Sequence, residues 1–167
     1  MEVLVMYHSR TGQTRALAEE IAKGVREVDG IECRLKSADK VTAEDFVAAS
    51  GIIAGSPVYF GTMAAELKSV FDRLVSVRKS MAGKVGAAFA TSANPNGGKE
   101  TTLISILQAM LIYGMILVGD PLEASGHYGA AHSGKQDAAS ADIARKLGRR
   151  VAELAGALYS ASSAKRF

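Results

Sequence analysis

The chain has 167 residues, of which 48% are hydrophobic and 22% are charged, a length and composition typical of one globular domain. Its excess of three positive charges is too small to indicate a nucleic-acid partner, and we expect none. The single cysteine, Cys33, excludes a secreted scaffold held together by internal disulfides.

The first residues carry an acid, Glu2, and only a short apolar run, which is unlike a signal peptide. No apolar stretch approaches the ~18 residues that a membrane-spanning helix needs, so we expect no membrane insertion and a cytoplasmic location. Residues 1–167 are expected to form a single domain, with a frayed tail over about 160–167, where the residues are small and basic.

Two kinds of apolar segment alternate along the chain. Short continuous runs are typical of strands buried on both faces, whereas apolar residues at helical spacing predict amphipathic helices. In chain order the expected elements are strand 3–7, helix 17–28, strand 31–35, helix 42–49, strand 52–55, helix 67–74, strand 85–90, helix 103–111, strand 115–118 and helix 143–158.

Strands that alternate with helices predict a parallel sheet covered on both faces, which is an α/β three-layer sandwich with five strands. Only the segment 31–35 alternates apolar with polar residues, as an edge strand does. We therefore expect the strand order 2-1-3-4-5. In such a sheet ligands bind at the carboxyl ends of the strands, so the loops there are the candidate site.

The loop after the first strand runs straight into a helix and is rich in hydroxyl groups. Free backbone N–H groups and the dipole at a helix N-terminus attract an anion. Because no Gly-x-Gly-x-x-Gly is present, the loop suits a terminal phosphate monoester better than a dinucleotide pyrophosphate. The alternative is an ordinary helix cap, which needs only one hydroxyl. The candidate residues are Ser9, Arg10, Thr11, Gly12, Gln13 and Thr14.

The loop after the third strand combines a proline, two aromatic residues and a glycine. Pro57 stiffens the exit from the strand, and Gly61 leaves backbone exposed beside the rings of Tyr59 and Phe60. This combination can hold a flat heterocycle, although the aromatic rings could instead cap the core. The candidate residues are Pro57, Val58, Tyr59, Phe60, Gly61 and Thr62.

The loop after the fourth strand ends in glycine and lysine before a helix, as a phosphate-binding P-loop does. It departs from that pattern at Ala93, where a glycine belongs, and at Glu100, where Ser or Thr should bind magnesium. A nucleoside-triphosphate hydrolase is therefore disfavoured, and a polar loop over the same sheet edge remains. The candidate residues are Thr91, Ser92, Ala93, Asn94, Gly97 and Gly98.

The last loop contains His127 and Tyr128, which can cover a ligand or supply a proton near neutral pH, so His127 is a possible catalytic residue. A solvated loop histidine is the alternative. His127 and His132 do not share a helix face and Cys33 lies on a distant strand, so we expect no metal site. The absence of Gly-x-Ser-x-Gly gives no support to a hydrolase.

Taken together, the four loops resemble those of the flavodoxin-like flavoproteins. The hydroxyl-rich loop is similar to the family's FMN phosphate loop, and the stretch 55–63 resembles the WrbA-type NAD(P)H:quinone oxidoreductases. The segments 97–102, 113–115 and 128–130 extend this resemblance over nearly the whole chain. It implies that FMN is held by the candidate residues of all four loops and that electrons pass from NAD(P)H to a small-molecule quinone acceptor. It also implies a homodimer or homotetramer.

The alternative within the same fold is a flavodoxin-type electron carrier that uses FMN to serve protein redox partners. Such carriers are usually acidic around the flavin and shield it with tryptophan or tyrosine. The net charge of +3, the pI near 9.0 and the absence of tryptophan favour the enzyme. A weaker alternative is a regulator that uses FMN as a sensor.

Overall fold

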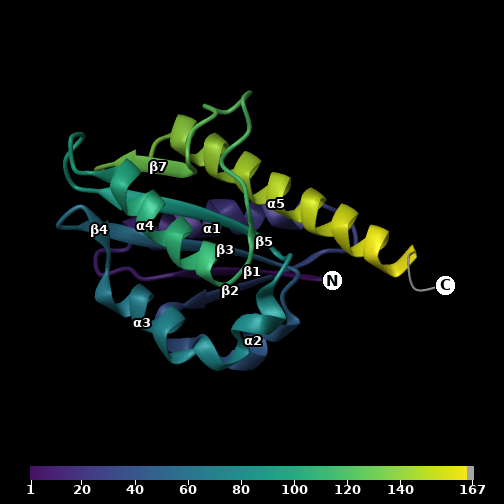
Figure 1. Cartoon of the computed structure of the whole chain (residues 1–167). Coiled ribbons are helices and arrows are strands. Elements are labelled where there is room, and N and C mark those ends of the chain that lie inside the picture. The colour runs from purple at the N-terminus through teal and green to yellow at the C-terminus, as the bar shows by residue number, and fades with distance from the viewer. Residues whose placement is uncertain (165–167) are drawn as a thin grey trace.

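The computed structural model describes the backbone of residues 1–164 and the side chains of residues 1–161. Its centre is a parallel sheet (Figure 1). The strands that form its main path, in the spatial order β2-β1-β3-β5-β6, are β1 (Glu2–Tyr7), β2 (Glu32–Ser37), β3 (Gly51–Tyr59), β5 (Val85–Ser92) and β6 (Ile116–Leu117). This order is the predicted 2-1-3-4-5, and strand β2 lies at the edge as its alternating pattern indicated.

Five α-helices cover the two faces of the sheet, which confirms the three-layer sandwich (Figure 1). Helices α1 (Gln13–Arg26) and α5 (Ala138–Ala164) share one face, where their apolar residues pack against Val3 and Val5 of β1. Leu4 and Met6 point into the other face, which is covered by α2 (Ala43–Ala48), α3 (Ala65–Arg73) and α4 (Lys99–Ile112). Two short 3-10 helices, Ala38–Lys40 and Val75–Met81, join these elements on the second face.

The first and last helices touch through glycines. A Cβ atom at Gly24 of α1 would collide with the carbonyl oxygen of Arg145, and one at Gly148 of α5 would collide with that of Ile21. The two backbones therefore approach closely, and this contact fixes the position of α1, whose N-terminus follows the phosphate loop.

Strand β3 is longer than the predicted segment 52–55. It continues to Tyr59 because Gly55 and Pro57 pair with Phe89 and Thr91 of β5. Glycine and proline have low strand propensity, so the sequence pattern indicated a loop from residue 56 onward. The missing Cβ at Gly55 leaves the space that the ring of Phe89 occupies. A turn at residues 60 and 61 then leads into the short antiparallel strand β4 (Thr62–Met63).

The last predicted strand is divided into two. Strand β6 pairs with Val85 and Gly86 at the start of β5, and β7 (Ala130–Ser133) pairs with residues 89–92 at its end. With β4 and β7 added to the five strands of the main path, the described sheet has seven strands. The predicted strand 115–118 covers only β6, because Pro121, which lacks an N–H group, and the following turn interrupt the pairing.

The C-terminal helix α5 extends through Ala164, which includes the first residues of the predicted frayed tail over 160–167. Residues 165–167 of that tail lie outside the described residues. No helix within residues 1–164 combines the length and apolar character needed to cross a membrane.

Candidate functional site

Three of the four predicted loops meet at the carboxyl ends of β1, β3 and β5, where they line one cleft of about 340 Å³. We call it the loop cleft. It is lined by Arg10, Thr11, Gln13, Thr14, Pro57, Val58, Tyr59, Thr91, Ser92, Ala93 and Gly134. Parallel strands bring these loops together because their carboxyl ends all lie at one edge of the sheet.

The N-terminus of α1 opens on this cleft without a side-chain cap from its N-cap residue. That residue, Gly12, has a φ of 90°, in the left-handed region that favours glycine, and nothing lies within 4 Å of where its Cβ would be. The hydroxyl of Ser9 accepts hydrogen bonds from the N–H groups of Gly12 at 3.1 Å and Arg15 at 3.3 Å. The N–H groups of Gln13 and Thr14 belong to the first turn and have no partner within the helix.

Thr14 is buried, and its Oγ1 atom lies 2.8 Å from the Oγ1 atom of Thr91 on β5. This bond ties α1 to the centre of the sheet. Either hydroxyl can donate, so the pair uses one proton internally and leaves the other available to a ligand. Of the three hydroxyls that the sequence places in the loop, Ser9 serves the helix start, Thr14 joins the strand and Thr11 is exposed.

The turn between β3 and β4 presents an aromatic tip. Phe60 and Gly61 have φ values of 51° and 77°, as a tight hairpin turn requires, and the Phe60 side chain is fully exposed. The Tyr59 ring lies 5.4 Å from the guanidinium carbon of Arg10, which is a cation–π contact. The exposed Phe60 ring does not cap the core, and the Tyr59 ring is half-buried beside Arg10 and His8.

A charged group flanks the same turn. The Oε1 atom of Glu66 lies 3.5 Å from Nη2 of Arg10 and 3.5 Å from Nε2 of His8. A hydrogen bond from its own backbone N–H, opposed by desolvation and helped by these two partners, lowers the pKa of Glu66. Arg10 therefore lies between a carboxylate on one side and the loop cleft on the other.

The loop between β5 and α4 reaches over to this turn. Gly98 has a φ of 77°, and a Cβ atom there would lie 3.3 Å from the Cα atom of Gly61. Hydrogen bonds within the loop stabilise its conformation. The Ser92 hydroxyl donates to the carbonyl of Asn94 at 2.7 Å, and the Asn94 side chain accepts from the Asn96 N–H at 2.9 Å. The two glycine-containing turns thus meet above the sheet edge.

His127 and Tyr128 do not line the loop cleft. They precede β7, which begins opposite Phe89 in the second half of β5, so they lie back from the carboxyl edge of the sheet. They line a separate pocket of about 170 Å³ with Lys99 and Glu100. The buried carboxylate of Asp120 shapes this loop, accepting from the N–H of His127 at 2.8 Å and from the Ser125 hydroxyl.

The residues from the fourth loop that do reach the carboxyl edge are His132, Ser133 and Gly134, which the sequence analysis did not select. His132 is buried opposite Thr91, and burial lowers its pKa. Ser133 accepts a hydrogen bond from Lys99 at 2.7 Å. In the sequence they follow Gly129 in a short segment of small and polar residues, which is too brief to distinguish from a loop. No group of three potential metal ligands occurs among the residues that the structure describes.

The chain's own features fit FMN. The N-terminus of α1, where the N–H groups of Gln13 and Thr14 have no partner within the helix and space is open above Gly12, suits a phosphate. The aromatic tip together with the adjoining backbone of the Gly98 loop suits a flat ring. These features lie at neighbouring points of one sheet edge. A parallel sandwich with such a site defines a flavodoxin-like flavoprotein.

Comparison with known proteins specifies the family. Residues 1–129 match the family model described as NADPH-dependent FMN reductase, and the chain belongs to this family. It is 34% identical over 185 residues to an NAD(P)H dehydrogenase (quinone) of Archaeoglobus fulgidus, covering 92% of this chain and 96% of the relative. It is also 35% identical over 158 residues to a flavodoxin of Aquifex aeolicus, covering 91% and 85%.

Among solved structures, the flavodoxin, WrbA-like protein from Agrobacterium tumefaciens has a TM-score of 0.81 at 26% identity, covering 93% of this chain and 98% of that one. The fold and the WrbA-type resemblance are confirmed. The chain is an oxidoreductase whose cofactor is FMN and whose electron donor is NAD(P)H.

Proposed function

We propose that the protein transfers two electrons from NAD(P)H to a quinone-type acceptor. In the overall reaction NAD(P)H, a proton and the quinone give NAD(P)+ and the hydroquinone. The observation that carries this proposal is the fully exposed aromatic tip at Phe60, which leaves open space beside the loop cleft for two substrates in turn. Relatives named NAD(P)H dehydrogenase (quinone), at 32% and 34% identity, support the choice of acceptor.

When bound, FMN supplies the two-electron chemistry, and the protein supplies binding and orientation. In this proposal the N–H groups of Gln13 and Thr14 and the hydroxyl of Thr11 hold its phosphate, and Arg10 adds a positive charge beside them. Tyr59 and Phe60 provide stacking surface for the ring. The backbone of the Ala93–Gly98 loop lies where it can donate hydrogen bonds to the ring edge.

The second candidate is an electron carrier for protein partners. The flavodoxin relative from Aquifex aeolicus, at 35% identity, is the specific observation in its favour. Against it stand the net charge of +3 and the absence of tryptophan. A carrier would accept electrons from NAD(P)H only when a reductase is present.

The test is a spectrum of the purified holoprotein followed by NAD(P)H oxidation with and without benzoquinone. We expect one FMN per chain, identified by mass spectrometry of the released flavin, and oxidation that depends on the quinone. Retention of FAD, or oxidation that occurs only with an added reductase, would contradict the proposal.

Three expectations from the sequence stay predictions. Assembly into a homodimer or homotetramer is checked by analytical ultracentrifugation. A cytoplasmic location is checked by cell fractionation. A catalytic role for His127 is checked by comparing turnover of His127→Ala with wild type, and its position in the separate pocket with Lys99 and Glu100 makes a small effect the expected result.

A further inference from the structure

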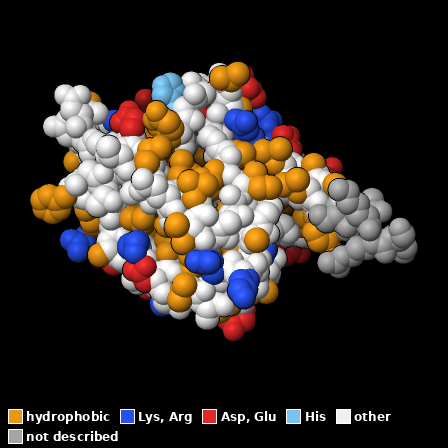
Figure 2. Space-filling view, in the orientation of Figure 1, with side chains coloured by type: hydrophobic (Ala, Val, Ile, Leu, Met, Phe, Trp, Pro, Cys, Tyr) orange, Lys and Arg blue, Asp and Glu red, His pale blue; other side chains and the backbone are white. Residues whose placement is uncertain are grey.

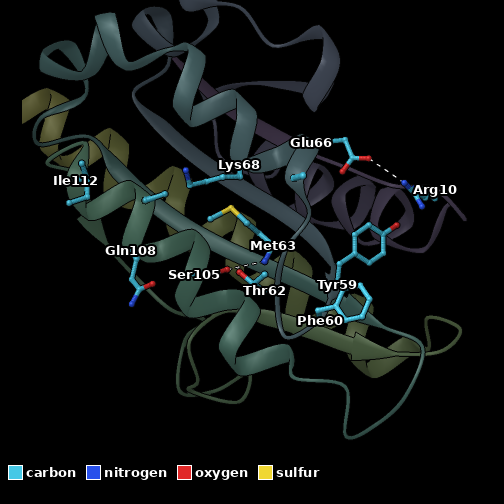
Figure 3. Close-up of a pocket in the computed structure, with 12 residues that line it drawn as sticks. Arg10, Tyr59, Phe60, Thr62, Met63, Glu66, Lys68, Ser105, Gln108 and Ile112 are labelled. Atoms are coloured by element: carbon cyan, nitrogen blue, oxygen red, sulfur yellow. Dashed lines mark hydrogen bonds and ion pairs between the residues drawn. The ribbon is translucent and has the colours of Figure 1, made fainter.

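A broad groove lies between α3 and α4, and we call it the α3–α4 groove (Figure 3). Its volume is about 920 Å³, which lies within the range of small-molecule sites. Figure 3 shows it running from Tyr59 and Phe60 at one end to Ile112 at the other, with Met63 and Ser105 between them. In the space-filling view, apolar side chains gather on the face that carries α3 and α4 (Figure 2).

Two polar groups in the middle of the groove, the N–H of Met63 and the hydroxyl of Ser105, already have protein partners. The N–H of Met63 donates to Oγ of Ser105 at 3.1 Å, and Ser105 donates to the carbonyl of Thr102 at 2.7 Å. Ala65 and Ala109 line the groove with apolar side chains, and the side chains of Thr62 and Gln108 add polar groups at its exposed edge. In the middle of the groove a polar ligand would therefore gain few hydrogen bonds, whereas an apolar one would break none.

The charges at the rim are paired in the same way. Arg10 lies 3.5 Å from Glu66, and Lys68 contacts Asp72 at 2.6 Å. A pyrophosphate, as in NAD(P)H, would have to displace these carboxylates or lie beside them. The groove therefore favours an apolar occupant over the dinucleotide.

The groove adjoins the loop cleft, since Arg10 and Tyr59 line both. From Ser105 to Ile112, α4 advances by seven residues, which is about 10 Å of helix. A molecule with a flat head beside the aromatic tip and a flexible apolar tail would fill both parts.

We propose that the α3–α4 groove binds the hydrocarbon tail of the acceptor, so that the substrate class is a quinone with a prenyl or alkyl chain rather than a bare quinone ring. This inference rests on the proposed function. It assigns Met63, Ala109 and Ile112 to tail binding and leaves the quinone ring beside Tyr59 and Phe60.

The test compares kcat/KM of the holoprotein for a decyl-substituted benzoquinone and for the same ring without the chain. Each two methylene groups that become fully buried are worth about tenfold, so we expect a preference for the tailed quinone of at least about tenfold. Ile112→Asn should reduce this preference. Leu111→Asn is the matched control, because Leu111 and Ile112 are adjacent and exposed to 59% and 68%, but only Ile112 lines the groove.

A second measurement is independent of turnover. Isothermal titration of farnesol into the holoprotein should give binding that Ile112→Asn weakens and Leu111→Asn does not. Ala109→Phe, which places a ring in the middle of the groove, should weaken it as well.

The outcomes separate the inference from the function on which it rests. Reduction of both quinones at equal kcat/KM, with no farnesol binding, would overturn the inference and leave the proposed function standing. Failure to reduce any quinone would remove both. A dimer in sedimentation that Ile112→Asn dissociates, with the quinone preference unchanged, would show that a second copy occupies the groove and would also overturn it.

Discussion

Thr11 and Thr14 are three positions apart in the sequence, yet the structure gives them different surroundings. Thr11 is exposed at the mouth of the loop cleft, whereas Thr14 is buried against Thr91. The first hydroxyl is free for a ligand, and the second holds two elements together. Their replacement should therefore affect different properties of the protein.

Replacing Thr11 by valine should weaken FMN binding by about tenfold or more, because a hydrogen bond to a charged group contributes about 1.5–3 kcal/mol. The free energy of unfolding of the apoprotein should stay within about 0.5 kcal/mol of wild type, as for an exposed residue. Quenching of flavin fluorescence on titration measures the affinity. Unchanged affinity would mean that the loop is an ordinary helix start.

Replacing Thr14 alone by valine should destabilise the apoprotein by about 1–3 kcal/mol, because it leaves the buried hydroxyl of Thr91 without this partner. Thr91→Val should cost a similar amount. The double variant should be less destabilised than the sum of the two, since both polar partners are then removed together. Urea denaturation of the four proteins measures the coupling, and strict additivity would argue against the bond.

Asp45 is a buried acid away from the loop cleft with several donors around it. It accepts from Lys36 at 2.7 Å, from the N–H of Thr42 at 2.8 Å and from Arg34 at 2.9 Å. Burial by itself would raise its pKa, but these hydrogen bonds outweigh burial and lower the pKa from 3.8 to about 2. The ionised form therefore stabilises the folded protein.

Because the folded pKa is the lower one, this stabilisation is present above about pH 4 and is lost as the pH falls toward 2. Its full size is about 2 kcal/mol. Wild type should lose more stability than Asp45→Asn between pH 5 and 2.5, measured by urea denaturation. Parallel pH curves for the two proteins would contradict the assignment.

At the scale of elements, the contact between the β3–β4 turn and the β5–α4 loop shapes one side of the loop cleft. Gly98 and Gly83 have nearly equal φ values, 77° and 78°, so alanine is strained to the same degree at both. A Cβ at Gly98 would also meet Gly61, whereas one at Gly83 would meet nothing within 4 Å. Gly83 is therefore a matched control for Gly98.

Both Gly98→Ala and Gly83→Ala should lower the free energy of unfolding by about 1–2 kcal/mol through backbone strain. Only Gly98→Ala should also weaken FMN binding, by roughly fivefold or more, which corresponds to about 1 kcal/mol. Flavin titration and urea denaturation of the two variants check this. Equal FMN affinities would mean that the contact between the turns does not shape the binding site.

The sequence predicted elements best where local pattern and tertiary environment agree. The buried runs at 3–7 and 85–90, and the edge character of 31–35, predicted the sheet order. Pro57 misled the prediction of where β3 ends, because pairing with Thr91 of β5 overrides its low strand propensity. Strand β7 has no apolar run of its own and forms because β5 extends beyond β6 and offers an unpaired edge.

The same limits apply to the site residues. Loops that follow a well-predicted strand, such as 9–14 and 91–94, were placed at the cleft, since the strand determines where they emerge. His127 and Tyr128 were predicted at the cleft but lie away from it, because they precede β7, whose His132 lies at the carboxyl edge opposite Thr91. Ion pairs between distant elements, such as Arg10 with Glu66, leave no local pattern in a sequence.

At the scale of the whole molecule, the open side of the loop cleft has a kinetic consequence. If NAD(P)H and the quinone use the same face in turn, initial-rate plots with both substrates varied should give parallel double-reciprocal lines. The exposed Phe60 tip and the turns around it leave one such face. Intersecting lines would indicate a complex that holds both substrates together.

Strands β6 and β7 pair with different parts of β5, so the segment that connects them can vary without altering either pairing. Each of the two strands keeps its own register with β5. After Val118, whose N–H donates to a carbonyl of β5 at 2.9 Å, no strand pairing involves residues 119–129. At the end of this segment the backbone of Gly129 packs directly against the carbonyl oxygen of Ala88, where a Cβ atom would not fit. Insertions near the exposed Leu122 can therefore lengthen this segment without shifting either register. A new recognition segment can therefore be inserted around Leu122 while the carboxyl edge of the sheet keeps its structure.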